Sequence, residues 1–79
     1  MATIKATMPG VFYRRPSPEA EPYVKEGGGF AAGQTIALIE VMKTFNEVRA
    51  DTSGTLVRFL LEDGDEVAMG QDIVEVDAA

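Results

Sequence analysis

The feature of this sequence that most limits its possible folds is an internal repeat. Residues 24–40 (VKEGGGFAAGQTIALIE) align with residues 61–77 (LEDGDEVAMGQDIVEVD) at an offset of 37 positions. Identical pairs include Gly27 with Gly64, Gly33 with Gly70, Gln34 with Gln71 and Ile36 with Ile73. A chain of 79 residues makes one domain. The repeat therefore predicts a single domain, residues 1–79, built from two similar halves.

The repeat extends toward the N-terminus with an insertion in its first half. Pro9-Gly10-Val11 resembles Ser53-Gly54-Thr55 at an offset of 44 positions, so the first half is seven residues longer. The additional residues fall at about 15–22, and prolines occupy positions 16, 18 and 22. Because proline cannot donate a hydrogen bond to a sheet, we expect an ordered loop here and not a strand.

Glycine and turn residues separate short apolar runs along the chain. These runs are Val11–Tyr13, Thr35–Val41, Phe45–Ala50, Thr55–Leu61 and Asp72–Val76. Short runs at this spacing predict strands, and several such strands are typical of an all-β sandwich or small barrel.

The segment around position 43 admits two interpretations. Its apolar residues, from Leu38 to Val48, are also spaced like one face of an amphipathic helix. The repeat favours strands, because 36–39 align with 73–76, a run rich in β-branched residues. We therefore predict strands at about 35–41 and 44–50, joined by a tight turn centred on Met42-Lys43.

This predicted turn has an unusual composition. Two-residue hairpin turns favour Asn-Gly, Asp-Gly or Gly-X because their central residues need positive φ. Met42-Lys43 satisfies neither pattern. Either the turn lies elsewhere, or a strained turn here marks a functional site, where local rules are most often broken.

The composition excludes several classes of function. The chain has no histidine and no cysteine, so Ser-His and Cys-His nucleophile pairs and thiolate metal sites are impossible within it. A net charge of −6 argues against nucleic-acid binding. No apolar run reaches the length of a membrane span, and residues 1–5 lack the apolar core of a signal peptide. We expect a cytoplasmic protein without catalytic residues of its own.

Several motifs in the chain match one family. Glu40-Val41-Met42-Lys43 followed by Thr44-Phe45-Asn46-Glu47 resembles the biotinylation motif of biotin carboxyl carrier proteins. Residues 9–18 (PGVFYRRPSP) resemble the segment leading into the "thumb" of the acetyl-CoA carboxylase type of carrier. The resemblance spans about residues 7–76. It implies a flattened β-barrel or sandwich of two four-stranded antiparallel sheets with pseudo-twofold symmetry, and a thumb at about 15–22.

The resemblance also implies a function. Biotin attached to Lys43 would accept CO2 at a biotin carboxylase and deliver it to a carboxyltransferase within acetyl-CoA carboxylase, a step in fatty acid biosynthesis. Val41 and Met42 would be recognised by the biotin protein ligase. Thr44, Arg15, Pro16 and Ser17 are candidate contacts of the biotin ring. Related thumbs often carry Thr or Ser at the position of Arg15, and the residue after the lysine is often Met, Leu or Ile instead of Thr44.

Two other functions fit the same fold. A lipoyl carrier would have an Asp-Lys-like pair at the tip, and Met42 argues against it. An unmodified barrel could serve as an interaction module. The acyl acceptor also stays open, with acetyl-CoA, propionyl-CoA and urea among the candidates.

Overall fold

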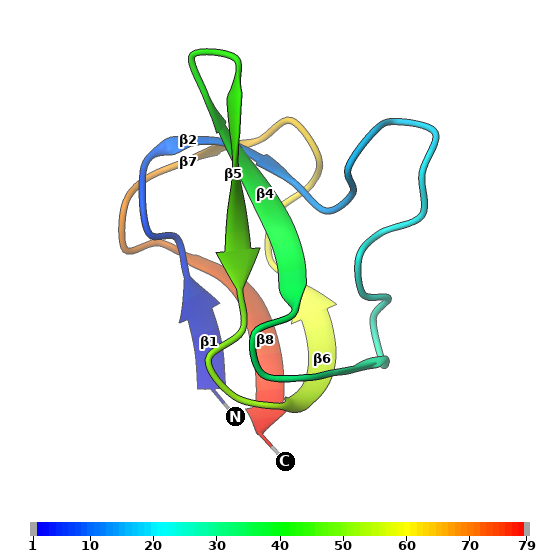
Figure 1. Cartoon of the computed structure of the whole chain (residues 1–79). Helices are drawn as coiled ribbons and strands as arrows, with labels where there is room; N and C mark the ends of the chain where they lie inside the picture. Colours follow the sequence, from blue (N-terminus) through cyan, green and yellow to red (C-terminus); the bar gives the residue numbers. More distant parts are fainter. Residues whose placement is uncertain (1, 79) are drawn as a thin grey trace.

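The computed structural model describes residues 2–78, which form eight β-strands and no helix. In chain order the strands are β1 (Ala2–Lys5), β2 (Gly10–Tyr13), β3 (Gly29–Phe30), β4 (Thr35–Val41), β5 (Thr44–Arg49), β6 (Gly54–Phe59), β7 (Glu66–Val67) and β8 (Asp72–Ala78). They make a small barrel-like sandwich from which the β4–β5 hairpin projects at one end (Figure 1). Within the described residues, no segment forms a helix able to cross a membrane.

The strands form two four-stranded antiparallel sheets with matching layouts. One sheet has the order β1-β8-β6-β3 and the other the order β5-β4-β2-β7. The sequence repeat relates three pairs of strands, β8 with β4, β6 with β2 and β3 with β7, and β1 and β5 occupy matching places at the edges of the two sheets. The all-β fold, the two four-stranded sheets and the pseudo-twofold arrangement are therefore confirmed.

Hydrogen bonds outside the strands follow the same symmetry. Gly27 donates its N–H to the carbonyl of Leu56 at 2.7 Å, and Gly64 donates to that of Phe12 at 2.8 Å. In each half, a glutamine side chain accepts the N–H of the residue three positions before it, Gln34 from Ala31 and Gln71 from Ala68, both at 2.9 Å. The shared Gly-Gln step in the sequence thus builds the same turn twice.

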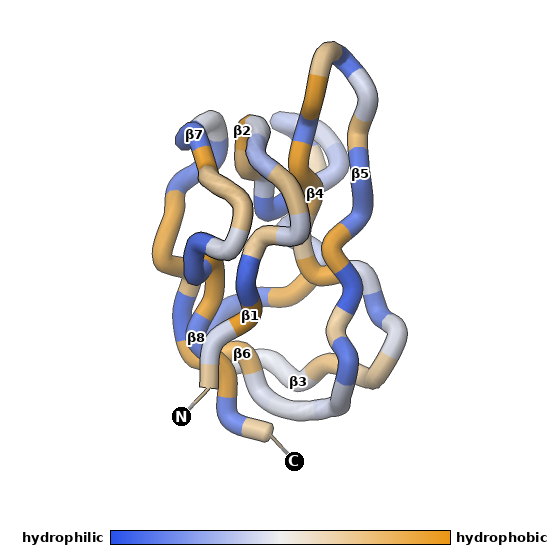
Figure 2. Tube along the Cα trace, turned by 90° about the vertical axis from the view of Figure 1, so that its left-hand side faces the viewer, coloured by the Kyte–Doolittle hydropathy of each residue, from blue (hydrophilic) through white to orange (hydrophobic). Residues whose placement is uncertain are grey.

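The space between the sheets is filled by apolar side chains from both halves. The largest of those that are fully buried are Phe12, Ile36, Ile39, Leu56, Ile73 and Val74. No polar or charged residue among 2–78 is buried. Figure 2 shows hydrophobic and hydrophilic positions alternating along β5, whereas Ile36–Ile39 of β4 are four consecutive apolar, buried residues.

The predicted strands agree with the observed ones, with differences at their ends. The run predicted at 55–61 ends at Phe59, and the strand predicted at 44–50 ends at Arg49. Three strands were not predicted: β1, β3 and β7. Two of these contain only two residues, which is too short for alternation to be visible in the sequence.

The long connection between β2 and β3 contains no strand, as the prolines predicted. We use "thumb" for residues 15–22 of this connection. The thumb is closed at its base where Tyr23 donates its N–H to the carbonyl of Arg14 at 3.0 Å. In Figure 1 it forms a separate lobe beside the body of the molecule, and both chain ends lie at the end opposite the β4–β5 turn.

Candidate functional site

The β4–β5 hairpin has the tight turn that the sequence predicted. Val41 pairs with Thr44, so Met42 and Lys43 alone make the connection. Both residues have positive φ, 49° for Met42 and 66° for Lys43, and no other non-glycine residue among 2–78 does. Each costs about 1–2 kcal/mol relative to a right-handed conformation. The alternative of a helix across this segment is excluded.

Polar contacts within the hairpin help to fix its shape. The Nδ2 of Asn46 donates to the carbonyl oxygens of Ile39 and Thr44, both at 3.3 Å. The strands themselves stay paired from Thr35 and Arg49 up to the turn. Because the pairing continues to the last residue before the turn, the tip is held at a defined position.

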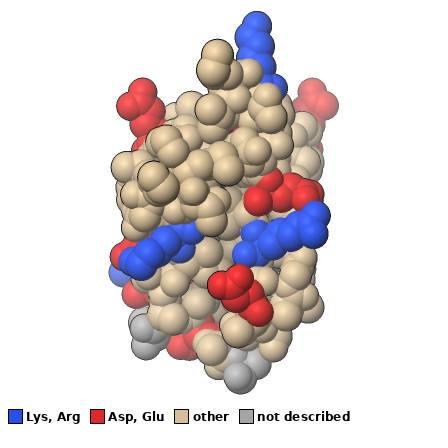
Figure 3. Space-filling view, turned by 60° about the vertical axis from the view of Figure 1, so that its left-hand side comes forward, with Lys and Arg blue, Asp and Glu red and all other residues tan. Residues whose placement is uncertain are grey.

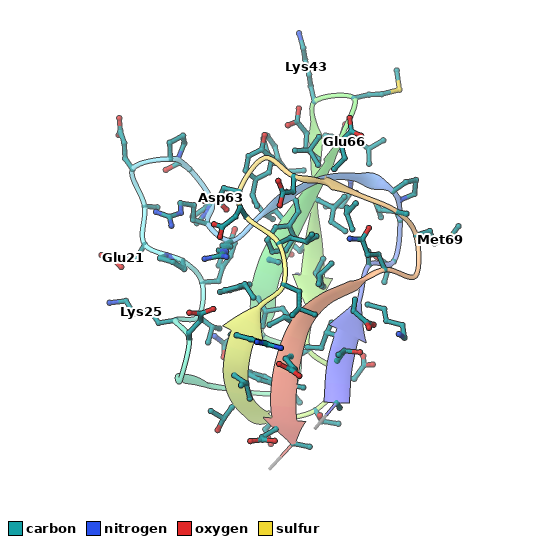
Figure 4. All side chains as sticks on the ribbon, turned by 180° about the vertical axis from the view of Figure 1, so that it is seen from behind. Glu21, Lys25, Lys43, Asp63, Glu66 and Met69 are labelled. Atoms are coloured by element: carbon teal, nitrogen blue, oxygen red, sulfur yellow. The ribbon has the colours of Figure 1, made fainter. Side chains whose placement is uncertain are left out.

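Lys43 lies at the outermost point of this hairpin. Figure 4 shows its side chain pointing away from the body of the molecule. The neighbouring Met42 is 93% exposed, and Thr44 is also exposed, whereas Val41 is half-buried. An exposed methionine of this kind contributes nothing to the core, so its apolar surface is available to a partner.

Lys43 also differs from the other cations in its electrostatics. Six of the seven Lys and Arg side chains form ion pairs with carboxylates: Lys5, Arg14, Arg15, Lys25, Arg49 and Arg58. Within residues 2–78, Lys43 has no such partner. In Figure 3 the basic and acidic side chains of one face gather in a band across the middle, below a largely uncharged surface that reaches up toward the tip. Among the residues that the structure describes, the Lys43 amine thus has no ion-pair partner.

A groove lies between the thumb and the hairpin. It has a volume of about 270 Å³ and is lined by Tyr13, Arg15, Pro16, Ser17, Pro18, Phe45 and Asp63. The predicted thumb residues Arg15, Pro16 and Ser17 are thus brought to one side of the hairpin. Val41, Met42 and Thr44 do not line this groove.

Two aromatic residues line the groove on its hairpin side. Tyr13 and Phe45 pack with ring centroids 6.1 Å apart, and Phe45 is 56% exposed. The Tyr13 hydroxyl donates to Oε1 of Glu40 at 3.3 Å. Burial first, and then the Glu40 charge, raise the pKa of the Tyr13 phenol, so it remains a hydrogen-bond donor at neutral pH.

Asp63 and Phe45 were not among the site residues predicted from the sequence. Asp63 comes from the loop after β6, far from the thumb in the chain, and Figure 4 shows it on the side of that loop facing the thumb. The repeat carried a signal for it, because Asp63 aligns with Glu26. Both carboxylates accept a backbone N–H from a residue of the opposite half, Asp63 from Arg14 and Glu26 from Phe59.

Comparison with known families bears on this geometry. Residues 2–76 match the model of the family described as "Biotin-requiring enzyme", the biotin/lipoyl attachment family. The chain belongs to this family. The match covers all eight strands except the last residues of β8, and it includes the hairpin with Lys43.

Curated relatives share the sequence over most of this chain. It is 39% identical over 69 residues to the biotin carboxyl carrier protein of acetyl-CoA carboxylase 1, chloroplastic, of Arabidopsis thaliana, covering 87% of this chain and 25% of that protein. It is 36% identical over 76 residues to the biotin carboxyl carrier protein of acetyl-CoA carboxylase of Nostoc sp., covering 96% and 42%. For the protein of the same name in Haemophilus influenzae, the identity is 32% over 74 residues, covering 94% and 48%. The chain thus spans from a quarter to about half the length of these relatives.

Proposed function

We propose that residues 1–79 are a single biotin-attachment domain whose Lys43 carries covalent biotin. The observation that carries this proposal is the state of Lys43: it stands at the tip of a hairpin, exposed, on a turn with positive φ, and without an ion pair among residues 2–78. Family membership supports the choice of cofactor.

The residues at the tip fit the attachment of a cofactor to lysine. A ligase must bring the ε-amine to an activated acyl group, and an exposed amine without an intramolecular partner requires no contact to be broken first. The neutral amine would attack the carbonyl of biotinyl-adenylate, an amide bond would form, and AMP would leave. The exposed apolar surface of Met42, next to the amine, offers the ligase a recognition element, flanked by Val41 and Thr44.

The chain's own residues then place the cofactor. When attached, biotin supplies the ureido nitrogen that takes up and releases a carboxyl group. The domain has neither histidine nor cysteine, and we assign catalysis to the partner active sites. Its role is to present the end of the Lys43 side chain, with few obstacles around it, to more than one partner active site.

The partners follow from the relatives. All three relatives described above are named as carriers of acetyl-CoA carboxylase. We therefore propose that this domain is a non-catalytic carrier within such a carboxylase, modified by a biotin protein ligase and visiting a biotin carboxylase and a carboxyltransferase. Acetyl-CoA is the proposed acceptor, and the cytoplasm the proposed location.

Intact-mass measurement tests the proposal. The purified chain is incubated with a biotin protein ligase, ATP and biotin, and separately with a lipoate ligase and lipoate. We expect one biotinyl adduct, mapped to Lys43 by peptide sequencing, and no lipoyl adduct. Lys43→Arg abolishes the adduct, whereas Lys25→Arg, a change at another exposed lysine, leaves it intact. A lipoyl adduct, no adduct, or an adduct on Lys25 would overturn the proposal.

A further inference from the structure

The thumb is held beside the hairpin by the carboxylate of Asp63. One oxygen, Oδ1, accepts the N–H of Arg14 at 2.6 Å, at the point where the chain enters the thumb. The other, Oδ2, lies 2.9 Å from Nε of Arg15. A single side chain of the opposite half therefore contacts the last residue before the thumb and the first residue of the thumb.

Arg15 also contacts the far side of the thumb. Its Nη1 donates to the carbonyl of Ala20 at 3.3 Å, so the guanidinium spans the loop from one limb to the other. Nε of Arg15 is buried and has no hydrogen-bond partner among residues 2–78. The contact with Asp63 is thus an ion pair with poor hydrogen-bond geometry, and its strength comes from charge.

The two contacts of Asp63 can be told apart by comparing Asp63 with Glu26, the residue at the same position of the repeat. Its counterpart Glu26 accepts the N–H of Phe59 at 2.9 Å and forms no ion pair with an arginine among residues 2–78. An acidic residue at this repeat position therefore accepts a backbone N–H of the opposite half in both cases. The ion pair with Arg15 belongs only to the half that contains the thumb.

Arg15 and Asp63 also line the groove between the thumb and the hairpin. The facing wall includes Phe45, two residues along β5 from Lys43. Two residues of strand span about 7 Å. A lysine side chain lengthened by a biotinyl group is longer than that, so the attached group can reach the groove.

From these contacts we infer that Asp63 is a positioning residue: through Arg15 it holds the thumb at the distance from the hairpin at which the groove accommodates the group attached to Lys43. This inference rests on the proposed function. It also assigns Arg15 the role of holding the thumb, in place of the hydroxyl contact that related thumbs with Thr or Ser offer. The charge of Asp63 is what matters, since its hydrogen bond to Arg14 needs only an oxygen.

The experiment compares Asp63→Asn with the unchanged chain, both with and without biotin on Lys43. The amide oxygen of asparagine can still accept the Arg14 N–H, so this change removes only the ion pair. Asp65→Asn is the matched control, because the Asp65 side chain bonds to Glu62 within its own loop. Nuclear magnetic resonance follows amide exchange at Ala20 and Tyr23, and the shifts of Ser17 and Phe45 on biotin attachment.

In Asp63→Asn we expect exchange at Ala20 and Tyr23 to rise about two- to fivefold, the range for one partly exposed ion pair. The attachment-induced shifts at Ser17 and Phe45 decrease and the mass of the adduct stays the same, while the thermal midpoint falls by about 2–8 °C, as expected for the loss of one such ion pair. Asp63→Glu restores both readings, and Asp65→Asn matches the unchanged chain. In an Arg15→Met background, Asp63→Asn has no further effect, because the charge it removes no longer has a partner.

The inference would be overturned if Asp63→Asn and the unchanged chain had equal shifts and equal amide exchange. It would also be overturned if Asp65→Asn changed them as much as Asp63→Asn does, or if Asp63→Asn kept its full effect in the Arg15→Met background. Absence of shifts at Ser17 and Phe45 in the fully biotinylated unchanged chain would also overturn it. Failure of the proposed function gives a different result, namely an unchanged chain that gains no biotin mass at all.

Discussion

At the scale of single residues, the site depends on two side chains placed where glycine would be more stable. Met42 and Lys43 both adopt the left-handed backbone conformation. A turn of glycine or asparagine would cost less, but it would present neither an amine nor an apolar contact. The turn is therefore less stable than a glycine turn would be, and in exchange it presents an exposed lysine next to an apolar side chain.

Replacing Met42 with glycine should separate stability from recognition. We expect Met42→Gly to stabilise the fold by about 0.5–1 kcal/mol, because relief of the left-handed strain exceeds the added entropy of the unfolded chain. In a domain of this size, that raises the thermal midpoint by roughly 2–8 °C. The rate of biotinylation should fall, since the exposed side chain is lost. Thr44→Gly, at a position without positive φ, should lower the midpoint. A lower midpoint for Met42→Gly would show that the turn carries no strain.

A second prediction at this scale concerns pH. The carboxylate of Asp72 accepts hydrogen bonds from Nζ of Lys5 at 2.5 Å and from Oγ1 of Thr3 at 2.8 Å. The hydrogen bond from Lys5, followed by that from Thr3, lowers the pKa of Asp72, and burial acts in the opposite direction. A carboxyl group with a lower pKa in the folded chain stabilises the fold at neutral pH. This contribution is lost as the pH falls below about 4.

Urea unfolding of Asp72→Asn and the unchanged chain checks this sign. At pH 7 the unchanged chain should have the larger free energy of unfolding. The difference should shrink between pH 4 and pH 2, when the carboxylate of the unchanged chain is protonated. A difference of the same size at both ends of this range would mean that the contribution of Asp72 does not depend on its charge.

The sequence predicted some of these residues and not others, for a physical reason. Lys43 stood out because the repeat favoured a strand before it, its predicted turn was atypical, and residues 40–47 resemble a biotinylation motif. Asp63 did not, because its partner Arg15 lies 48 positions away in the chain and the contact depends on how the thumb folds back. Periodicity describes how one segment faces the core. It contains no information about which two surface side chains meet.

At the scale of elements, two repeat-related glycines bring strands unusually close together. A Cβ added to Gly10 would lie 2.5 Å from the carbonyl oxygen of Glu40 and 2.6 Å from Cγ2 of Ile39. At the equivalent position in the other half, a Cβ on Gly54 would clash with the carbonyl oxygen of Asp77. Both contacts are with backbone or core atoms that cannot move aside freely. The glycines of β2 and β6 therefore set how closely each strand approaches its neighbour.

We expect Gly54→Ala to destabilise the fold by about 1–3 kcal/mol, the range for overpacking of a well-packed site. Gly10→Ala should behave in the same way, since the repeat places it in the same surroundings. Gly29→Ala is the control, because its added Cβ would lie 3.7 Å from the nearest atom, an ordinary contact. Thermal unfolding measures all three. Equal midpoints for Gly54→Ala and Gly29→Ala would show that the close approach is not required.

Element boundaries were predictable where the repeat or a run of β-branched residues defined them. Strand β4 was predicted to the residue in this way. Strands β3 and β7 were not, because they exist only through pairing with β6 and β2, which belong to the opposite halves of the repeat. Such short strands depend on tertiary structure and leave no local pattern.

At the scale of the whole molecule, the matching strand orders of the two sheets relate the β4–β5 hairpin to the pairing of β8 with β1. The chain ends thus occupy the position that the turn with Lys43 occupies in the other half, and Ala2 pairs with Val76. A circular permutant is therefore expected to fold. In it, a Gly-Gly link joins residues 79 and 1, and new ends are opened in the thumb between Glu19 and Ala20.

We expect this permutant to retain a cooperative thermal transition and full biotinylation of Lys43. Its midpoint should fall modestly, because the cut releases one limb of the thumb. The matched permutant opened between Met42 and Lys43 should fold but lose biotinylation, since the amine then lies on a free chain end. If the permutant opened in the thumb fails to fold, the chain ends do not lie where a turn between β8 and β1 could connect them.

The chain ends and Lys43 lie at opposite ends of a body measuring 34 × 27 × 20 Å, and under the proposed function this placement bears on how biotin would reach a partner. A linker attached at either chain end would leave the domain on the side away from Lys43. The tip of the β4–β5 hairpin would then enter a partner's pocket first, and the linker would not cross the entrance of that pocket. A longer linker would enlarge the volume that the domain can search, and it would not change how deeply the hairpin enters the pocket.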